Sequence, residues 1–266
     1  MNRRNRDHRQ SRDAAPRRPD RGDWIYGRRP VLEVVKAGKR HIYEAILPPQ
    51  GHDAPEIAEL RGLLRARDVT CLALEREELD ALCDGGNHQG VAIRAGSYPY
   101  ISIEQVIHDV QENADALVLL LDHIEDPQNV GSLLRTADAA GVTAVLIPED
   151  RAAGVTPAAV RASAGASEHL RVAKVVNLVR AMKELQEAGA WITGLDMSPD
   201  AKLHTALDFK GRVGLVVGSE GRGLSRLVGE TCDFIARLPM NGRVASLNAG
   251  VAGAIALYEI LRQRGK

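Results

Sequence analysis

Five near-continuous apolar runs in the second half of the chain constrain its fold more than any other feature. Runs of this kind are typical of parallel strands that helices cover on both faces. Helical patterns separate them, and the first places Val130, Leu133 and Leu134 on one face of a helix expected over 130–140. The runs are ALVLLLD (116–122), VTAVLIP (142–148), AWITGLD (190–196), RVGLVVG (212–218) and FIARLP (234–239). The sequence therefore predicts an α/β domain with a parallel sheet over residues 113–266.

A smaller α/β module is predicted ahead of this domain, over residues 24–96. Its length of about 70 residues is small for a complex active site, so a binding module is the better interpretation. Residues 97–112 carry a polar helix and are expected to link the two parts. The elements expected in the module are a helix from Pro30 to Ala37, a strand over 42–49, a helix over 54–67, a strand over 69–75, a helix over 76–83 and a loop over 85–93 that enters a strand.

The first 23 residues form a separate, basic segment. They hold eight Arg and four Asp and almost no apolar side chains, although the whole chain has a formal net charge of zero. Such a segment cannot bury enough surface to offset the entropy of ordering it, so residues 1–23 are predicted to be a disordered arm. Two roles are open: a solvated tail without function, or an arm that follows an RNA phosphate backbone. The acidic residues argue against a mitochondrial transit peptide.

Hydropathy and cysteine usage indicate an ordinary cytoplasmic globular protein. No apolar run approaches the roughly 18 residues of a membrane span, and the N-terminus lacks the apolar core of a secretory signal. Cys71, Cys83 and Cys232 are odd in number and widely spaced, so we expect reduced thiols in the core. They form no metal-type pair, and neither a disulfide framework nor a metal site is predicted.

The glycine-rich loop VVGSEGRGLS (216–225) follows a late strand, at the edge where parallel sheets bind ligands. A Walker loop would need Lys and then Ser or Thr after its last glycine, but Leu224 and Ser225 stand there. A dinucleotide loop would follow the first strand and would have its close pair of glycines first. Glu220 would also repel a di- or triphosphate, whereas a carboxylate can orient a hydroxyl or a cationic ligand. The loop therefore favours a ligand with a positive centre and exchangeable hydroxyls.

Three ordered stretches resemble the motifs of one family. They are NVGSLLR (129–135), VVGSEGRGL (216–224) and LPMNGRVASLNAGVAGAIALYE (238–259). In order and spacing they are similar to the motifs of the SpoU/TrmH branch of the SPOUT methyltransferases, which transfer a methyl group from S-adenosylmethionine to a ribose 2′-OH in RNA. The smaller module resembles the substrate-binding domain of this family, through WIYGRRPVLEVVKAGKRHI (24–42) and NHQGVA (87–92).

The resemblance implies a fold, a cofactor and partners. The SPOUT domain would contain a deep trefoil knot, a rare exception to unknotted connections, formed by the loops at 218–223 and 238–247. A homodimer is implied in which the last helix, expected over 247–263, packs across the two-fold axis, where Gly250 and Gly253 suit close packing. The two domains together imply methylation of a guanosine in the P loop of 23S rRNA. The residues expected to bind S-adenosylmethionine are Gly218, Leu238, Met240, Leu247, Gly223 and Thr193.

The same resemblance implies five catalytic residues: Asn129, Arg135, Glu220, Ser246 and Asn248. Arginine is a poor base, since its pKa lies above about 12, so we expect Arg135 to bind a substrate phosphate and to stabilise the developing alkoxide. Glu220 would orient Arg135 or Asn129. Structural alternatives stay open: Asn129 and Ser246 as helix caps, Arg135 in a surface ion pair, and Glu220 at the start of the helix after its own loop.

Two rival functions share these motifs. A tRNA ribose methyltransferase of the same branch is one, but its relatives usually lack a module such as 24–96, so this module favours rRNA. A non-catalytic knotted RNA-binding protein is the other, and the intact catalytic set argues against it. The last motif departs from the family pattern at Ala249 and Gly250, and glycine costs a helix about 0.5–1 kcal/mol relative to alanine. The role of His88 and Gln89 stays open: they are either turn residues or RNA contacts.

Overall fold

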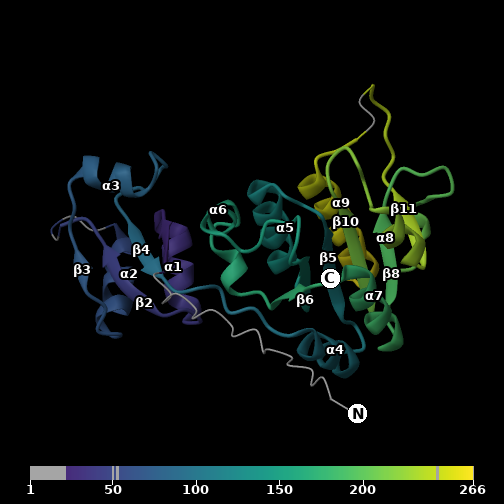
Figure 1. The fold of residues 1–266 in the computed structure, drawn as a ribbon, viewed down its shortest axis with the longest axis horizontal. Helices are drawn as coiled ribbons and strands as arrows, with labels where there is room; N and C mark the ends of the chain where they lie inside the picture. The colour runs from purple at the N-terminus through teal and green to yellow at the C-terminus, as the bar shows by residue number, and fades with distance from the viewer. Residues whose placement is uncertain (1–21, 50, 52–53, 244–245, 266) are drawn as a thin grey trace, which may run out of the picture.

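The computed structural model describes residues 22–49, 51, 54–243 and 246–265. Over these residues the strands form a four-stranded sheet in the order β1-β4-β2-β3 and a seven-stranded sheet in the order β7-β6-β5-β10-β8-β11-β9. The smaller sheet lies in the N-terminal part and the larger in the C-terminal part, and the two parts follow one another along the long axis (Figure 1). The strand pairs of the larger sheet are parallel, so the predicted α/β architecture is confirmed.

The elements follow the chain in this order. The N-terminal part contains β1 (Asp23–Tyr26), α1 (Arg28–Ala37), β2 (Ile42–Ile46), α2 (Pro55–Arg65), β3 (Cys71–Leu72), α3 (Arg76–Leu82) and β4 (Ala92–Ala95), after which comes α4 (Ile103–Glu112). The strands of the C-terminal part are β5 (Leu117–Asp122), β6 (Ala144–Pro148), β7 (Val172–Val175), β8 (Trp191–Leu195), β9 (Lys202–Leu203), β10 (Val213–Gly218) and β11 (Phe234–Arg237). Its helices are α5 (Pro127–Ala139), α6 (Pro157–Ala162), α7 (Leu178–Glu187), α8 (Arg226–Thr231) and α9 (Ala249–Gln263), with 3₁₀ turns η1 (Ala166–Glu168) and η2 (His204–Ala206).

The N-terminal part begins with a strand that the sequence analysis did not anticipate. β1 pairs antiparallel with β4, and Ile25 is fully buried. Gly27, with a φ of +96°, turns the chain from β1 into α1, which therefore begins at Arg28 and not at the predicted Pro30. Asp23 was assigned to the arm but belongs to β1; residues 1–21 lie outside the described residues.

β5 illustrates why the larger sheet is buried on both faces. All six of its residues are buried. Leu117, Leu119 and Leu121 join a core with α5 and α9, while Val118 and Leu120 join a second core with α4, α7 and α8. Successive side chains of a strand point to opposite faces, so a sheet covered on both sides requires an unbroken apolar run.

Two strands and two helix starts differ from the prediction. β7 carries an exposed residue and β9 has only two residues, so neither produces a long apolar run. α5 begins at Pro127 because Asp126 caps it, its side chain accepting a hydrogen bond from the backbone N–H of Gln128 at 2.9 Å. α9 begins at Ala249 rather than at 247.

The glycines of α9 pack inside the chain. A Cβ atom on Gly250 would lie 2.9 Å from Oγ of Ser132, and one on Gly253 would lie 2.4 Å from Cδ2 of Leu133. Both contacts are to α5 of the same chain, so the expectation that these glycines serve a two-fold axis is wrong. The departure at Gly250 from the family pattern therefore has a packing reason.

The segment 97–112, expected as a linker, packs against the larger sheet. Ser102 caps α4, and Val106 and Val110 on its inner face are fully buried. At the other end of the helix, the guanidinium of Arg212 donates to the carbonyl oxygens of Val110 at 2.7 Å and Gln111 at 2.8 Å. α4 is therefore held to the C-terminal part along its inner face and at its C-terminal end.

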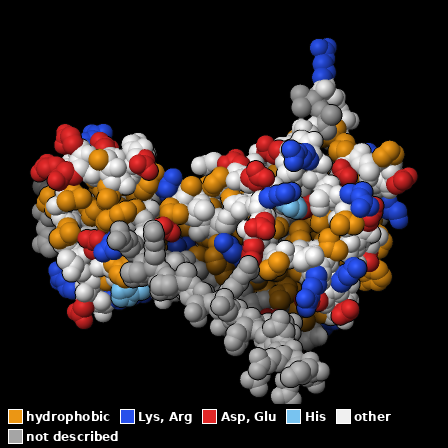
Figure 2. All heavy atoms as spheres, in the orientation of Figure 1, with side chains coloured by type: hydrophobic (Ala, Val, Ile, Leu, Met, Phe, Trp, Pro, Cys, Tyr) orange, Lys and Arg blue, Asp and Glu red, His pale blue; other side chains and the backbone are white. Residues whose placement is uncertain are grey.

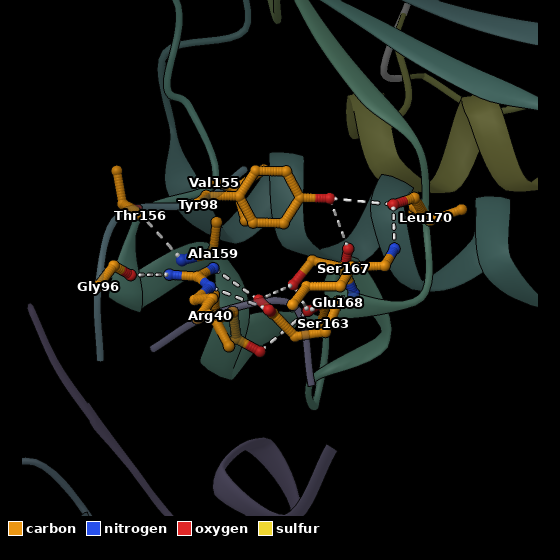
Figure 3. A network of polar contacts seen from close by, with 12 residues as sticks. Arg40, Gly96, Tyr98, Val155, Thr156, Ala159, Ser163, Ser167, Glu168 and Leu170 are labelled. Atoms are coloured by element: carbon orange, nitrogen blue, oxygen red, sulfur yellow. Dashed lines mark hydrogen bonds and ion pairs between the residues drawn. The ribbon is translucent and has the colours of Figure 1, made fainter. Parts of the chain in front are cut away.

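A buried polar network joins the two parts (Figure 3). Arg40, which follows α1, donates to both carboxylate oxygens of Glu168 in η1, at 2.9 and 2.6 Å, and both side chains are at most 1% exposed. The hydroxyl of Tyr98 donates to the carbonyl oxygens of Ser167 and Leu170. Burial raises the pKa of Tyr98, which keeps this donor protonated. Because a bidentate Arg–carboxylate pair has a fixed geometry, the network sets the orientation of the two parts.

The cysteines agree with the prediction only in part. All three are free thiols; Cys83 is buried and Cys232 is half-buried, but Cys71 is exposed. Cys71 lies in β3, a two-residue strand at the edge of the smaller sheet, so the expectation of a core position is wrong there. Within the described part of the chain, no helix has both the length and the hydropathy to cross a bilayer, and no three His, Cys, Asp or Glu side chains gather as a metal site.

Candidate active site

A cavity of about 370 Å³ opens at the carboxyl ends of β8, β10 and β11. Open parallel sheets bind ligands at this edge, because loops from neighbouring strands meet there. The loop after β11 rises from the upper end of the larger sheet in Figure 1. The walls come from the end of β8 and the residues that follow it (Leu195 to Met197), and from the end of β10 and its loop (Val217 to Gly223). Leu238, Met240, Ser246 and Leu247, which precede α9, and the alanines Ala236, Ala249 and Ala252 complete the lining.

The glycine-rich loop after β10 folds back on its own strand. The backbone N–H of Gly223 donates to the carbonyl oxygen of Ser219 at 3.0 Å, and Gly221 and Gly223 have φ values of +77° and +65°, which glycine adopts without strain. A Cβ atom on Gly218 would lie 2.3 Å from the carbonyl oxygen of Gly223. These glycines therefore make a tight backbone turn at the cavity wall.

Glu220 joins three segments beside this cavity. Its Oε1 accepts hydrogen bonds from Nδ2 of Asn129 at 3.1 Å and from the backbone N–H of Ala249 at 3.2 Å. Nδ2 of Asn248 donates to the same oxygen and, at 2.7 Å, to Oδ1 of Asn129. Asn129 is buried, whereas Glu220 and Asn248 are exposed. Three predicted catalytic residues thus form one hydrogen-bonded group, which we call the Glu220 group.

The helix-cap alternatives are decided by these contacts. Asn248, and not Ser246, caps α9, its side chain accepting a hydrogen bond from the backbone N–H of Val251 at 3.2 Å. Asn129 is inside α5 and is not its cap. Glu220 complements the start of α9 instead of the helix after its own loop. Capping therefore fixes Asn248 and Glu220 beside the cavity, and a capping role does not exclude a chemical one.

The predicted cofactor residues fall into two sets. Gly218, Leu238, Met240, Leu247 and Gly223 all line the cavity. Thr193 does not: it is 2% exposed and lies inside β8, between β10 and β11. Asp196 and Met197, a few residues further along the chain, line the cavity instead, and no motif in the sequence marks them.

Of the two remaining predicted catalytic residues, Ser246 lies at the cavity and Arg135 does not. Ser246 lines the cavity. Arg135 is exposed on α5 and, among the described residues, makes neither a hydrogen bond nor an ion pair and lines neither cavity at this edge. Of the two partners predicted for Glu220, it therefore contacts Asn129 and not Arg135. The surface ion pair that was the alternative for Arg135 is not formed within the part described.

The electrostatics of the cavity suit a ligand with a positive centre. Asp196 and Glu220 bring two carboxylates, and Arg222 one guanidinium, to walls that are otherwise mainly apolar, so negative charge exceeds positive charge there. Such walls bind a flat apolar group, and the carboxylates attract a cation beside it. Cys232 packs against β8, and burial raises the pKa of its thiol to about 12, so it brings no charge near neutral pH.

His88 and Gln89 are turn residues in this fold. Nδ1 of His88 accepts a hydrogen bond from the backbone N–H of Gly90 at 2.9 Å, and Nε2 lies 2.9 Å from Oδ1 of Asp80. Oε1 of Gln89 accepts from the backbone N–H of Arg28 at the start of α1, at 3.3 Å. These contacts all lie within the N-terminal part, as the turn interpretation expects.

Fold and site together define a two-part α/β protein with a small-molecule cavity at the carboxyl edge of a parallel sheet. The model of the SpoU rRNA methylase family matches residues 116–258. A second model, for RNA 2′-O ribose methyltransferase substrate binding, matches residues 24–101. The chain belongs to the SpoU rRNA methylase family.

Relatives extend over nearly the whole chain. It is 38% identical, over 92% of its length, to the 23S rRNA (guanosine-2′-O-)-methyltransferase RlmB of Xylella fastidiosa strain 9a5c, of which it covers 98%. It is 39% identical, over 93% of its length, to an uncharacterized tRNA/rRNA methyltransferase of Mycolicibacterium vanbaalenii, of which it covers 79%. The structure of the SpoU methyltransferase AviRb from Streptomyces viridochromogenes with AdoMet matches with a TM-score of 0.74 at 26% identity, over 91% of this chain and 90% of AviRb. The predicted SpoU/TrmH resemblance is confirmed.

Proposed function

We propose that this chain transfers a methyl group from S-adenosylmethionine to the ribose 2′-hydroxyl of a guanosine in 23S rRNA. The observation that carries the proposal is the Glu220 group, which three distant motifs build at the cavity wall. The substrate-binding match over 24–101 supports an RNA substrate, and the RlmB relative supports guanosine in 23S rRNA. Such a substrate would place the protein in the cytoplasm.

The cavity residues fit S-adenosylmethionine, which supplies a methyl group on a positively charged sulfur when bound. The backbone of the loop from Gly218 to Gly223 and the side chains of Leu238 and Leu247 would hold its adenosine. Asp196 and Glu220 would favour its positive charge, because opposite charges attract strongly where water is scarce. AviRb, which shares this fold, was crystallised with AdoMet.

The Glu220 group would hold the acceptor ribose. Nδ2 of Asn129 donates one of its two hydrogens to Glu220, so the second is available to the ribose. Arg135 lies on the surface of α5, and we assign to it a contact with an RNA phosphate outside the cavity. Glu220 acts on the reaction through Asn129 and Asn248, which it holds in one geometry.

Surface charge favours RNA contact through the larger part. Figure 2 shows acidic side chains gathered over α3, at the outer end of the smaller part, while on the larger part Lys and Arg are spread with Asp and Glu among them. Glu75, Glu77 and Glu78 are exposed at the start of α3 and would repel phosphates. RNA would therefore lie away from α3.

A homodimer through α9 belongs to the proposal. Val251, Ile255 and Tyr258 lie at helical spacing on α9 and are 47%, 40% and 55% exposed. Apolar side chains in such a stripe suit a second copy of the same helix. The trefoil knot stays a prediction, since its loops include residues 244–245, outside the described residues.

Methyl transfer to defined RNAs tests the function. Purified protein with radiolabelled S-adenosylmethionine is expected to label a 23S rRNA transcript that contains the P loop, and mapping is expected to place one 2′-O-methyl group on a guanosine. Asn129→Ala should slow transfer about 100-fold, since it removes a positioned hydrogen-bond donor. If only tRNA were labelled, the substrate would be tRNA and not rRNA. RNA binding without cofactor binding in isothermal titration would support a non-catalytic protein.

A further inference from the structure

A second cavity, of about 410 Å³, lies beside the first. It opens between the chain after β5, the chain after β6 and the loop after β10. Glu220 and Arg222 line both cavities, and Asn129 lines the second. Molecules bound in the two cavities would therefore meet at the Glu220 group, as the donor and the acceptor of a transferred group must.

His123 enters this second cavity next to a buried carboxylate. Asp122, at the end of β5, is 1% exposed and accepts hydrogen bonds from the backbone N–H of Ser225 at 2.6 Å and from its hydroxyl at 3.3 Å. Nδ1 of His123 lies 2.5 Å from Oδ1 of Asp122, and the His123 side chain is 41% exposed. A carboxylate only accepts, so Nδ1 carries the proton and Nε2 of the neutral ring is left as an acceptor. Among the described residues, Nε2 has no hydrogen-bond partner.

The backbone of His123 turns at the end of β5. Its φ of +56° lies in the left-handed region, which histidine adopts more often than most residues that carry a side chain. The contacts of Asp122 hold the end of β5, and the turn presents the imidazole at the cavity.

Charged groups of both signs surround His123. Arg151 and Arg222 are exposed at the cavity and, within the described part of the chain, make no ion pair. Guanidinium groups bind phosphates with paired hydrogen bonds. The charged side chains that line the cavity with His123 are Asp122, Glu125, Asp126, Glu220, Arg151 and Arg222.

Among the residues described at the two cavities, His123 is the best proton acceptor for a hydroxyl near neutral pH. The other titratable groups there are carboxylates and guanidiniums. Carboxylates are weak bases, and a guanidinium does not lose its proton in proteins. An imidazole titrates nearest to neutrality, which makes histidine the commonest general base.

We propose that the second cavity binds the acceptor nucleotide of the RNA and that Nε2 of His123 takes the proton of its 2′-hydroxyl. This rests on the proposed function and names the acceptor side of the same site. As the bond from O2′ to the methyl carbon forms, the bond from that carbon to sulfur breaks, sulfur keeps the electron pair, and the hydroxyl proton passes to Nε2. The imidazolium then lies against Asp122, which stabilises it. Arg151 and Arg222 bind the phosphates on either side.

His123→Gly tests this role without threatening the fold, because glycine adopts a positive φ freely. Single-turnover transfer at saturating S-adenosylmethionine and RNA should slow about 10²–10⁴-fold, with both affinities changed by less than about threefold. Added imidazole should restore part of the rate, which a structural role would not allow.

Asp84→Gly is the matched control, since Asp84 also has a positive φ and lies in the smaller part. It should transfer methyl groups at the wild-type rate. A His123→Gly protein that keeps its rate within about threefold, or that is slow and insensitive to imidazole at every pH, overturns the assignment. If wild-type protein methylates no RNA, the proposed function and this inference fall together; if only the His123 result fails, the function stands.

Discussion

Gly218 allows the loop after β10 to turn back onto its own strand. Its neighbour across the turn is backbone, the carbonyl oxygen of Gly223, which cannot rotate away as the end of a side chain can. A side chain at this position would therefore displace the whole turn from Ser219 to Gly223, and Glu220 with it. The position of Glu220 at the cavity therefore depends on Gly218 having no Cβ atom.

Gly218→Ala is expected to weaken S-adenosylmethionine binding at least about tenfold and to lower the free energy of unfolding by about 1–3 kcal/mol, the usual cost of overpacking. Gly229→Ala in α8 is the control, since a Cβ atom added there would have no neighbour within 4 Å. The control should bind the cofactor normally and should be as stable as the wild type or more so, because alanine is the better helix former. Titration calorimetry and urea unfolding measure both quantities. Normal binding by Gly218→Ala would show that the turn tolerates displacement.

α9 uses its two faces for different contacts. Its glycine face lies against α5, and the close approach brings Asn248 at its start to Asn129. The opposite stripe of Val251, Ile255 and Tyr258 has no cover in the single chain described. A helix of this kind is fixed to its own core by one face and leaves the other for a partner.

Ile255→Glu is expected to convert the dimer to a monomer, because it would bury a charge in the proposed interface. Val176→Glu is the control: Val176 is 83% exposed and lies away from α9. Sedimentation equilibrium should give the mass of two chains for the wild type and the control and of one chain for Ile255→Glu. A wild-type protein that sediments as a monomer would contradict the α9 interface.

The whole molecule depends on the buried junction between its parts. Arg40 comes from the smaller part and Glu168 from the larger, and the network around them also includes Tyr98 from the connecting segment (Figure 3). Since α4 packs on the larger sheet as well, the chain between the two sheets is held along its length. Under the proposed function, the smaller part would hold RNA at a fixed distance from the cavity.

Arg40→Met is expected to lower the free energy of unfolding by about 3–5 kcal/mol, because it leaves the Glu168 carboxylate buried without a partner. The double variant Arg40→Met with Glu168→Met should recover most of this loss, since no buried charge remains. Arg180→Met removes an exposed ion pair with Glu184 and should leave the free energy of unfolding almost unchanged. Urea unfolding distinguishes the three. A double variant as unstable as Arg40→Met would mean that the lost packing, and not the unpaired charge, sets the cost.

The sequence by itself determined the parallel sheet and the edge of that sheet where the motifs lie. Apolar runs such as 116–122 carry this information locally, because a strand buried on both faces needs an apolar side chain at every position. The strand-end rule then places Glu220 and the chain before α9 at one edge. β1, β7 and β9 escaped prediction, because these short edge strands carry exposed residues and form no long apolar run.

Only the tertiary structure decided which residues meet. Glu220 reaches Asn248 across 28 positions and Asn129 across 91, and Arg40 reaches Glu168 across 128. Periodicity describes the faces of one element and says nothing about distances between elements. The same limit explains why the structure turned Gly250 toward α5 and placed Thr193 inside the sheet, since both outcomes follow from packing between segments far apart in the chain.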